Sequence, residues 1–210
     1  MIRILLADDH AVVRKGLRQI VEEDNDMQVT GEAQNGEEAL SLVRSTTFDV
    51  VMLDVSMPGR GGLDVLRDLK AEPQAPKVIV LSMYPEEQYA IRSLRDGASA
   101  YLTKNCPPEE LLLAVRTVSA GKRYITPSVA ERLASFIEDD VQGAPHEKLS
   151  NRELQILVLV GSGKQPTEIA AELNLSVKTV STYRARILEK MGMETNAQLI
   201  RYALQHRLVD

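Results

Sequence analysis

Short apolar runs alternate with amphipathic stretches through the N-terminal part of the chain. Most of these runs are rich in Val, Ile and Leu and apolar throughout, which is typical of parallel strands covered on both faces. Strands are expected at residues 2–7, 27–33, 49–53, 77–81 and 98–102. Helices are expected between them, at residues 11–23, 36–45, 61–71, 86–96 and 108–120. This alternation predicts an α/β fold with a doubly wound, parallel, five-stranded sheet in the flavodoxin-like order 2-1-3-4-5.

The pattern changes after Gly121. Thr126 followed by Pro127 is typical of a helix cap and a first-turn proline, so a helix is expected at about residues 127–137. The stretch after it has two aspartates, a glycine, a proline and few apolar residues, which indicates a linker. The predicted division is a first domain, a linker and a second domain at residues 1–121, 122–147 and 148–210.

The second domain is predicted to contain helices only. Ser150 with Glu153, and Thr195 with Gln198, have the spacing of capping boxes. Four helices are expected, at about residues 151–160, from 166, at 177–191 and at 196–206. The short second helix, a tight turn at residues 174–176 and the longer third helix form a helix-turn-helix (HTH) pattern. We therefore expect a small all-α, four-helix HTH domain.

Composition and charge narrow the class of protein. The 210 residues contain one cysteine, Cys106, which excludes a disulfide framework and fits a reducing cytoplasm. No apolar run is long enough to span a membrane, and no signal-peptide pattern is present, so neither a membrane partner nor export is expected. The net charge is −5, yet residues 148–210 carry nine Lys/Arg and six Asp/Glu. A basic segment on an acidic body favours a polyanionic partner for that segment.

Polar side chains gather at the ends of the predicted strands. Asp8 and Asp9 follow the first strand, Asp54 the third, Ser82 the fourth and Lys104 the fifth. The carboxyl ends of the strands in such a sheet line one crevice, where ligands bind. Three carboxylates, a hydroxyl and an ammonium in that crevice predict a magnesium and phosphoryl site. Each residue alone has a plainer interpretation, as a turn, a cap or a solvated side chain.

The long third helix of the second domain carries the candidate DNA contacts. Small hydroxyl side chains flanked by arginines suit base edges and phosphates respectively. The candidates are Lys178, Thr179, Ser181, Thr182, Arg184, Ala185, Arg186 and Lys190. The apolar residues of the same helix, Val177 and Val180 among them, are expected to pack inward. The helix pattern by itself also permits a solvated face in an ordinary four-helix domain.

Two sets of motifs carry a family resemblance. The first set comprises Asp8-Asp9, Asp54, Met57-Pro58-Gly59, Ser82, Tyr101 and Lys104. The second set comprises residues 149–153 (LSNRE), 168–170 (EIA) and 175–180 (LSVKTV). The first segment resembles a response-regulator receiver domain, and the second resembles a LuxR-type HTH domain. Together they resemble the NarL/FixJ family of bacterial transcription factors, over essentially the whole chain.

The resemblance implies a role for each residue of the first set. Asp54 matches the phosphoacceptor, with Lys104 and Ser82 binding the phosphoryl oxygens. Mg²⁺ is implied as the cofactor, held by Asp8, Asp9, Asp54 and the backbone carbonyl of Ser56. Ser82 and Tyr101 match the switch pair: Ser82 moves toward the phosphoryl group, and Tyr101 turns inward into the space that this leaves.

The resemblance also implies partners. A sensor histidine kinase would phosphorylate the protein, which would then form a homodimer and bind a two-fold symmetric double-stranded DNA site. RNA polymerase is a further candidate partner. The chain departs from the family at Pro166-Thr167, where Asn-Lys is frequent, and at Ser181 and Tyr183, where Lys and His are frequent. The first departure concerns a backbone contact near the first DNA-facing helix. The second concerns base preference rather than the mode of binding.

Two other function classes compete with this interpretation. Aspartyl-phosphate hydrolases of the haloacid dehalogenase type also use aspartate and magnesium, but they carry a second aspartate two residues after the nucleophile. Ser56 occupies that position here, and no cap domain is evident, so an enzyme is disfavoured. A regulator that binds DNA without phosphorylation is the third class. The complete acidic set argues against it.

Overall fold

The computed structural model describes residues 1–57, 62–83, 86–138, 144–173, 175–206 and 208–209. The chain divides into two compact units, Met1–Glu138 and Asp139–Asp210. The loop residues Pro58 and Gly59, the turn residue Asn174 and linker residues 139–143 lie outside the described residues.

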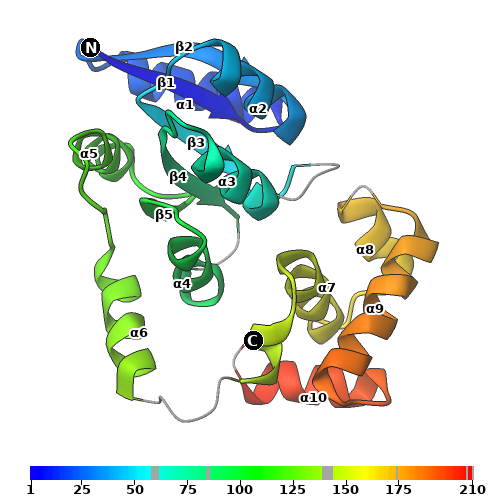
Figure 1. The fold of residues 1–210 in the computed structure, drawn as a ribbon. Coiled ribbons are helices and arrows are strands. Elements are labelled where there is room, and N and C mark those ends of the chain that lie inside the picture. Colours follow the sequence, from blue (N-terminus) through cyan, green and yellow to red (C-terminus); the bar gives the residue numbers. More distant parts are fainter. Residues whose placement is uncertain (58–61, 84–85, 139–143, 174, 207, 210) are drawn as a thin grey trace. The chain divides into compact units, whose positions relative to one another are not determined.

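The first unit alternates strands and helices along the chain (Figure 1). Its strands are β1 (Ile2–Ala7), β2 (Met27–Ala33), β3 (Val50–Asp54), β4 (Lys77–Ser82) and β5 (Ala100–Thr103). Its helices are α1 (Ala11–Glu22), α2 (Gly36–Ser45), α3 (Gly62–Ala71), α4 (Glu86–Arg95), α5 (Pro108–Ser119) and α6 (Pro127–Glu138). The described strands form one parallel sheet in the order β2-β1-β3-β4-β5, which confirms the predicted fold.

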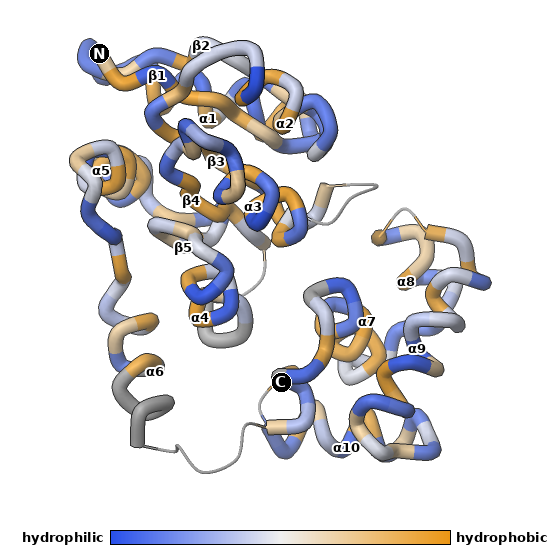
Figure 2. Tube along the Cα trace, viewed as in Figure 1, coloured by the Kyte–Doolittle hydropathy of each residue, from blue (hydrophilic) through white to orange (hydrophobic). Residues whose placement is uncertain are grey.

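Both faces of the central strands β3 and β4 are buried, which explains why these strands are almost entirely apolar, whereas β2 at the edge alternates buried and exposed positions. Ile4, Met52 and Ile79 belong to a core cluster on one face, together with residues of α1 and α5. Their neighbours Leu5 and Leu53 point to the opposite face and are also fully buried, because strand side chains alternate between faces. Figure 2 shows orange, apolar positions along β1 and β4 in the first unit.

The strand ends differ slightly from those expected. β3 begins at Val50 rather than Asp49, whose carboxylate instead accepts a hydrogen bond from the Arg3 N–H at 2.7 Å. β4 extends to include Ser82, and β5 begins at Ala100 rather than Ala98. These shifts of one or two residues do not move the polar groups away from the carboxyl edge of the sheet.

The helix expected near residues 127–137 is present as α6, and it packs against α4 within the first unit. The Val129 N–H donates to Thr126 Oγ1 at 3.4 Å, as expected for the cap. Val129 is buried. A short 3₁₀ helix, η1 (Pro145–Lys148), lies at the end of the stretch that the sequence indicates as linker.

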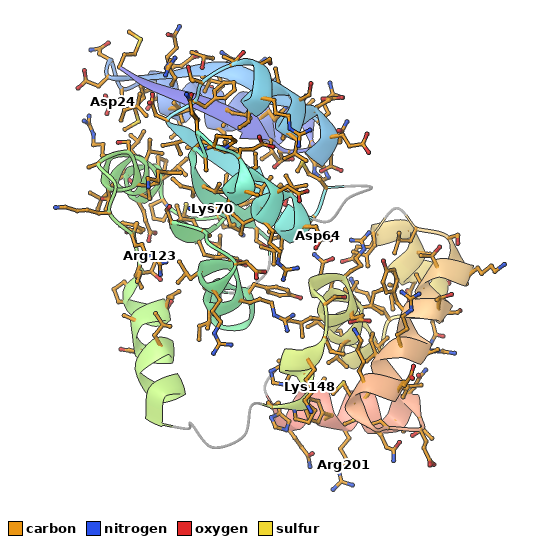
Figure 3. The ribbon with its side chains drawn as sticks, in the orientation of Figure 1. Asp24, Asp64, Lys70, Arg123, Lys148 and Arg201 are labelled. Atoms are coloured by element: carbon orange, nitrogen blue, oxygen red, sulfur yellow. The ribbon has the colours of Figure 1, made fainter. Side chains whose placement is uncertain are left out.

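The second unit contains α7 (Asn151–Gly161), α8 (Pro166–Glu172), α9 (Val177–Met191) and α10 (Asn196–Gln205) after η1. Both predicted capping boxes are present: Glu153 N–H donates to Ser150 Oγ, and Gln198 N–H to Thr195 Oγ1. The helices bury one apolar core, which includes Ile156, Ile169, Val180, Ile187 and Leu199. α8 and α9 form the helix-turn-helix. Figure 3 labels two basic residues of this unit, Lys148 on η1 and Arg201 on α10.

Candidate functional site

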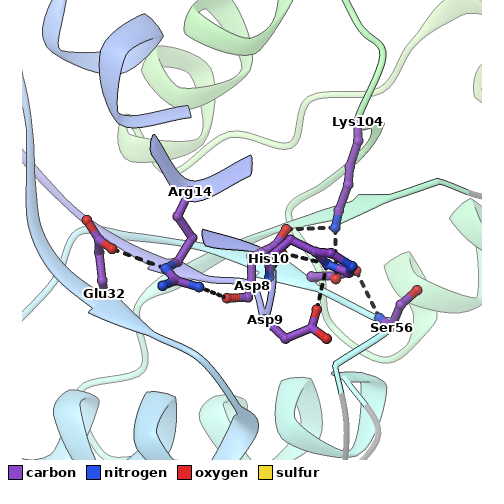
Figure 4. A network of polar contacts seen from close by, with 8 residues as sticks. Asp8, Asp9, His10, Arg14, Glu32, Ser56 and Lys104 are labelled. Atoms are coloured by element: carbon purple, nitrogen blue, oxygen red, sulfur yellow. Dashed lines mark hydrogen bonds and ion pairs between the residues drawn. The ribbon is translucent and has the colours of Figure 1, made fainter. Parts of the chain in front are cut away.

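Two acidic side chains and one lysine meet at the carboxyl edge of the sheet (Figure 4). Asp8 follows β1, Asp54 ends β3 and Lys104 follows β5. The Lys104 ammonium lies 2.7 Å from Asp8 Oδ2 and 2.8 Å from Asp54 Oδ2. All three side chains are buried, so this lysine balances part of the negative charge inside the protein.

Asp8 is held at each of its polar groups. Its Oδ1 accepts a hydrogen bond from the His10 N–H at 2.8 Å, and its Oδ2 pairs with Lys104. Its backbone N–H donates to the Ala33 carbonyl at 3.1 Å, and its carbonyl accepts from Arg14 Nη1 at 2.6 Å. These contacts fix both the main chain and the side chain of Asp8.

Asp9 is held far less. Its Oδ1 is buried and lies 2.8 Å from His10 Nδ1, but it makes no directed hydrogen bond within the described part of the chain. His10 Nδ1 also lies 3.3 Å from Asp8 Oδ1, and the imidazole is 64% exposed. Asp9 therefore keeps oxygen lone pairs for a further partner.

Asp54 is buried and tethered on both carboxylate oxygens. Its Oδ1 accepts a hydrogen bond from the Ser56 N–H at 2.9 Å, and its Oδ2 contacts Lys104. Burial raises the pKa of Asp54 above its ordinary value, although Lys104 and the Ser56 N–H act in the opposite direction. Burial acts to lower the pKa of Lys104, but the Asp54 and Asp8 carboxylates outweigh it and raise that pKa.

The residues present fit a divalent cation. One ligand atom from each of Asp8, Asp9, His10 and Asp54 lies within 4.8 Å of the others. Three carboxylates against one ammonium leave an excess of negative charge, and carboxylate oxygens are the donors that Mg²⁺ prefers. The buried Asp9 Oδ1, without a hydrogen bond in the described residues, is a site where such an ion would replace missing interactions.

The two switch candidates lie next to this cluster. Ser82 is fully buried at the end of β4, and its carbonyl accepts a hydrogen bond from the Lys104 N–H at 2.7 Å. Tyr101 lies on β5 and is 2% exposed, so surrounding residues cover its side chain in this structure. Ser82 pairs in register with Thr103, two residues beyond Tyr101.

α9 presents most of the candidate DNA contacts at its surface. Lys178, Ser181, Thr182, Ala185, Arg186 and Lys190 are exposed, and Thr179 and Arg184 are half-buried. Ser176 Oγ caps the helix by accepting a hydrogen bond from the Thr179 N–H at 3.0 Å. Val177 is 43% exposed, so the expectation that it packs inward is wrong, because the first turn of α9 extends beyond the core.

Lys190 differs from the other cations of α9. Its Nζ lies 2.7 Å from Glu153 Oε2, the buried carboxylate of the α7 capping box. Burial acts to raise the pKa of Glu153, but Lys190 and the Ser150 hydrogen bonds outweigh it and lower that pKa. Lys190 therefore ties α9 to α7, a contact that its helical position alone does not reveal.

Comparison with known proteins decides the family. Residues 4–116 match the family "Response regulator receiver domain", and residues 147–203 match "Bacterial regulatory proteins, luxR family". The response regulator UvrY of Escherichia coli (strain K12) is 39% identical over 211 residues, covering 100% of this chain and 97% of UvrY. The response regulator GacA of Pseudomonas viridiflava is 41% identical over 212 residues, covering 100% of this chain and 99% of GacA.

The chain belongs to the NarL/FixJ family of response regulators. A solved structure of RcsB from Salmonella enterica serovar Typhimurium, bound to the promoter rprA in the presence of the phosphomimetic BeF3-, is also similar to this response regulator. It has a TM-score of 0.64 and 26% identity, covering 96% of this chain and 98% of RcsB. Both matched families are regulatory, so the response regulator is a transcription regulator with a LuxR-type DNA-binding domain and not a haloacid dehalogenase-type enzyme.

Two contributors to the site were not predicted from the sequence of this response regulator. His10 lies directly after the acidic pair in the sequence, and this position is the signal that indicates its place. Arg14 lies one helical turn further on, and nothing in the pattern separates it from the other cations of α1.

Within the described residues, each helix of the response regulator is too short or too polar to cross a bilayer.

Proposed function

We propose that this response regulator is switched by Mg²⁺-dependent phosphorylation of Asp54, supplied by a sensor histidine kinase. The observation that carries the proposal is the buried Asp54 carboxylate, with Lys104 on one oxygen and the acidic cluster around it. In the reaction, an Asp54 oxygen forms a bond to phosphorus while the bond from phosphorus to the kinase histidine breaks. The histidine nitrogen keeps the electron pair of that bond.

The side chains around Asp54 supply positioning and charge. The Lys104 ammonium and the Ser82 hydroxyl bind phosphoryl oxygens, so the transferred group is held without further covalent chemistry. Asp9, Asp54 and the Ser56 carbonyl would hold the metal. The contacts of Asp8 with the Lys104 ammonium and the His10 N–H support an outer position for that residue. Mg²⁺, when bound, neutralises negative charge where the carboxylate meets the anionic phosphoryl group.

The switch acts through Ser82 and Tyr101. A phosphoryl group adds about −1.5 to −2 charge and three acceptor oxygens, which draw the Ser82 hydroxyl toward Asp54. In the active conformer, this hypothesis turns the Tyr101 ring inward, into the space that Ser82 leaves. Phosphorylation then shifts a population between existing conformers, in proportion to its preference for the active one.

The output of the switch is homodimerisation and binding of a two-fold symmetric promoter site. Two copies place their α9 helices in successive major-groove segments, with the exposed polar side chains toward the DNA. Lys178, Arg184 and Arg186 contact phosphates, and Ser181, Thr182 and Ala185 lie where bases are read. Thr179 and Lys190 complete the candidate set. The promoter-bound structure of RcsB supports this mode of binding. We place the action in the cytoplasm and keep RNA polymerase as a further candidate partner.

Phosphoryl uptake tests the proposal directly. The full chain is mixed with Mg²⁺ and acetyl phosphate, and covalent phosphate is measured by intact-protein mass spectrometry. Asp54→Asn should take up no phosphate. Asp64→Asn, which removes an exposed α3 carboxylate 3.5 Å from Arg67, should behave as the unchanged chain. Equal uptake by the Asp54 variant would assign the acceptor to another residue.

A further inference from the structure

Arg14 is a buried cation beside the acidic pair. It lies in the first turn of α1, six residues after Asp8, and only 7% of its surface is exposed. Burying a guanidinium is costly unless its N–H groups find acceptors. Arg14 Nη1 donates to the Asp8 carbonyl at 2.6 Å, and Nε donates to Glu32 Oε2 at 3.1 Å (Figure 4).

The hydrogen bond from Arg14 to the Asp8 carbonyl also affects the position of Asp9. That carbonyl belongs to the planar peptide unit that joins Asp8 to Asp9, so its direction fixes how the chain enters Asp9. The Asp8 N–H, on the other side of the residue, donates to the Ala33 carbonyl at 3.1 Å. Both main-chain groups of Asp8 are therefore hydrogen-bonded, one to Ala33 and the other to Arg14. This fixes the main chain directly before Asp9, whose own side chain makes fewer contacts.

Glu32 on β2 holds the Arg14 guanidinium through its Oε2 atom. Its second oxygen, Oε1, accepts hydrogen bonds from Arg18 Nη2 at 2.7 Å and Arg18 Nε at 2.9 Å. The hydrogen bond from Arg18 lowers the pKa of Glu32, with burial opposing and Arg14 assisting, so Glu32 is a carboxylate at neutral pH. One carboxylate is thus shared by two arginines, and of the two only Arg14 contacts Asp8 in the described residues.

We propose that Arg14 is a positioning residue for the phosphoacceptor site. Its guanidinium holds the Asp8–Asp9 peptide so that the Asp9 carboxylate faces the cation and the Asp8 carboxylate faces Lys104. The inference rests on the proposed function of this site as the place of Mg²⁺ binding and phosphoryl uptake. Groups that orient metal ligands typically change metal affinity or activity about 10- to 100-fold when removed.

Arg18 provides the matched control. It lies on the same helix and binds the same Glu32, and it also contacts Glu22 and the Val29 carbonyl. Arg18→Met therefore removes an α1–β2 ion pair and leaves the Asp8 carbonyl contact intact. Arg14→Met removes both kinds of contact while keeping most of the side-chain volume. A merely structural role for Arg14 predicts that both variants lose stability and keep the same affinity for Mg²⁺.

The test measures the Mg²⁺ dissociation constant of the full chain by isothermal titration calorimetry, and the rate of phosphoryl uptake from acetyl phosphate at saturating Mg²⁺. Arg14→Met should raise the dissociation constant about tenfold. Arg18→Met should change it by less than about twofold. Arg14→Lys, whose ammonium cannot span Asp8 and Glu32 as the planar guanidinium does, should fall between the unchanged chain and Arg14→Met.

Equal dissociation constants for Arg14→Met, Arg18→Met and the unchanged chain would overturn the inference, as would equal losses in both variants. If Arg14→Met does not fold, the pair Arg14→Lys and Arg18→Lys carries the same comparison, and equal affinities overturn it again. The measurements on the unchanged chain show whether the proposed function or only this inference has failed. If it neither binds Mg²⁺ nor takes up phosphate, the proposed function fails, and the inference that rests on it fails too.

Discussion

The Lys104 ammonium lies 2.8 Å from Asp54 Oδ2, so the proposed phosphoacceptor is ion-paired inside the folded protein. The same ammonium lies 2.7 Å from Asp8 Oδ2 and thus holds two buried carboxylates at one place. A buried ion pair is not in itself a source of stability, but removing one partner leaves an uncompensated charge. Lys104 therefore links the stability of the first unit to the charge of its site.

Lys104→Met should make folding dependent on a divalent cation. Without metal, the Asp8 and Asp54 carboxylates face each other without their shared cation, and the loss should be about 3 kcal/mol. Saturating Mg²⁺ should restore more stability to this variant than to the unchanged chain, because the ion supplies the missing positive charge. Urea unfolding with chelator and with Mg²⁺ measures both values. An equal gain from Mg²⁺ in both proteins would show that Lys104 does not balance these carboxylates.

Gly62→Ala should disturb the proposed phosphoacceptor, Asp54, through its main chain. A Cβ on Gly62 would lie 2.4 Å from Val55 Cα and 2.6 Å from the Asp54 carbonyl oxygen, so the backbone after β3 would have to move. We expect a loss of about 1–3 kcal/mol and slower phosphoryl uptake. Gly16→Ala is the control, since its Cβ meets nothing within 4 Å, and it should stabilise α1 by about 0.5–1 kcal/mol. Normal uptake by Gly62→Ala would contradict the close packing.

The Glu153–Lys190 pair should give the second unit a pH-dependent contribution to stability. The pKa of Glu153 is lower in the folded chain than its ordinary value of 4.5, so the carboxylate form favours folding. The contribution is complete above pH 4.5 and is lost as pH falls through the folded pKa. Glu153→Gln keeps an acceptor for the Ser150 N–H but loses the charge, and should cost about 1 kcal/mol because Lys190 is 42% exposed.

The measurement is urea unfolding of the full chain and of Glu153→Gln between about pH 3 and pH 7. The difference in free energy of unfolding should be constant at the upper end and approach zero at the lower end. Glu189→Gln, at an exposed position on α9, is the matched control. A difference that persists unchanged to the lowest pH would mean that the charge of Glu153 does not stabilise the unit.

Substitutions of Arg186 and Lys190 should have different effects on DNA binding, although both residues lie on α9. Arg186→Ala should weaken binding by similar factors on all sequences and reduce the slope of log affinity against log salt by about one, as expected for a lost phosphate contact. Lys190→Ala should chiefly lower the stability of the second unit, because Lys190 is paired with Glu153. Fluorescence anisotropy over a salt series gives both slopes. A loss confined to particular base sequences would make Arg186 a base reader instead.

The sequence predicts the sheet well because its signal is local. Strands such as residues 50–54 are apolar on both faces, and the capping boxes at Ser150 and Thr195 mark helix starts within four residues. The proximity of Asp8, Asp54 and Lys104 could be predicted from the sequence, because the carboxyl ends of parallel strands lie at one edge of the sheet. That geometric rule needs the strand order only, and the predicted order is correct.

Contacts set by side-chain direction lie beyond such rules. Nothing in the spacing of α1 distinguishes Arg14, which bends back to the Asp8 carbonyl, from Arg18, which does not. The pairing of Lys190 with Glu153 joins residues 37 positions apart through the packing of two helices. Val177 is apolar and falls on the inward face of an ideal helix, yet α9 begins outside the core and leaves it exposed.

Phosphorylation of Asp54 is proposed to control DNA binding. The most direct test measures the DNA-bound fraction of the full chain, selected from genomic fragments, with and without Mg²⁺ and acetyl phosphate, and Asp54→Asn alongside. Binding should rise with the phosphodonor in the unchanged chain and should not rise in the variant. Equal binding by both proteins in every condition would contradict it and leave a regulator that binds DNA without phosphorylation.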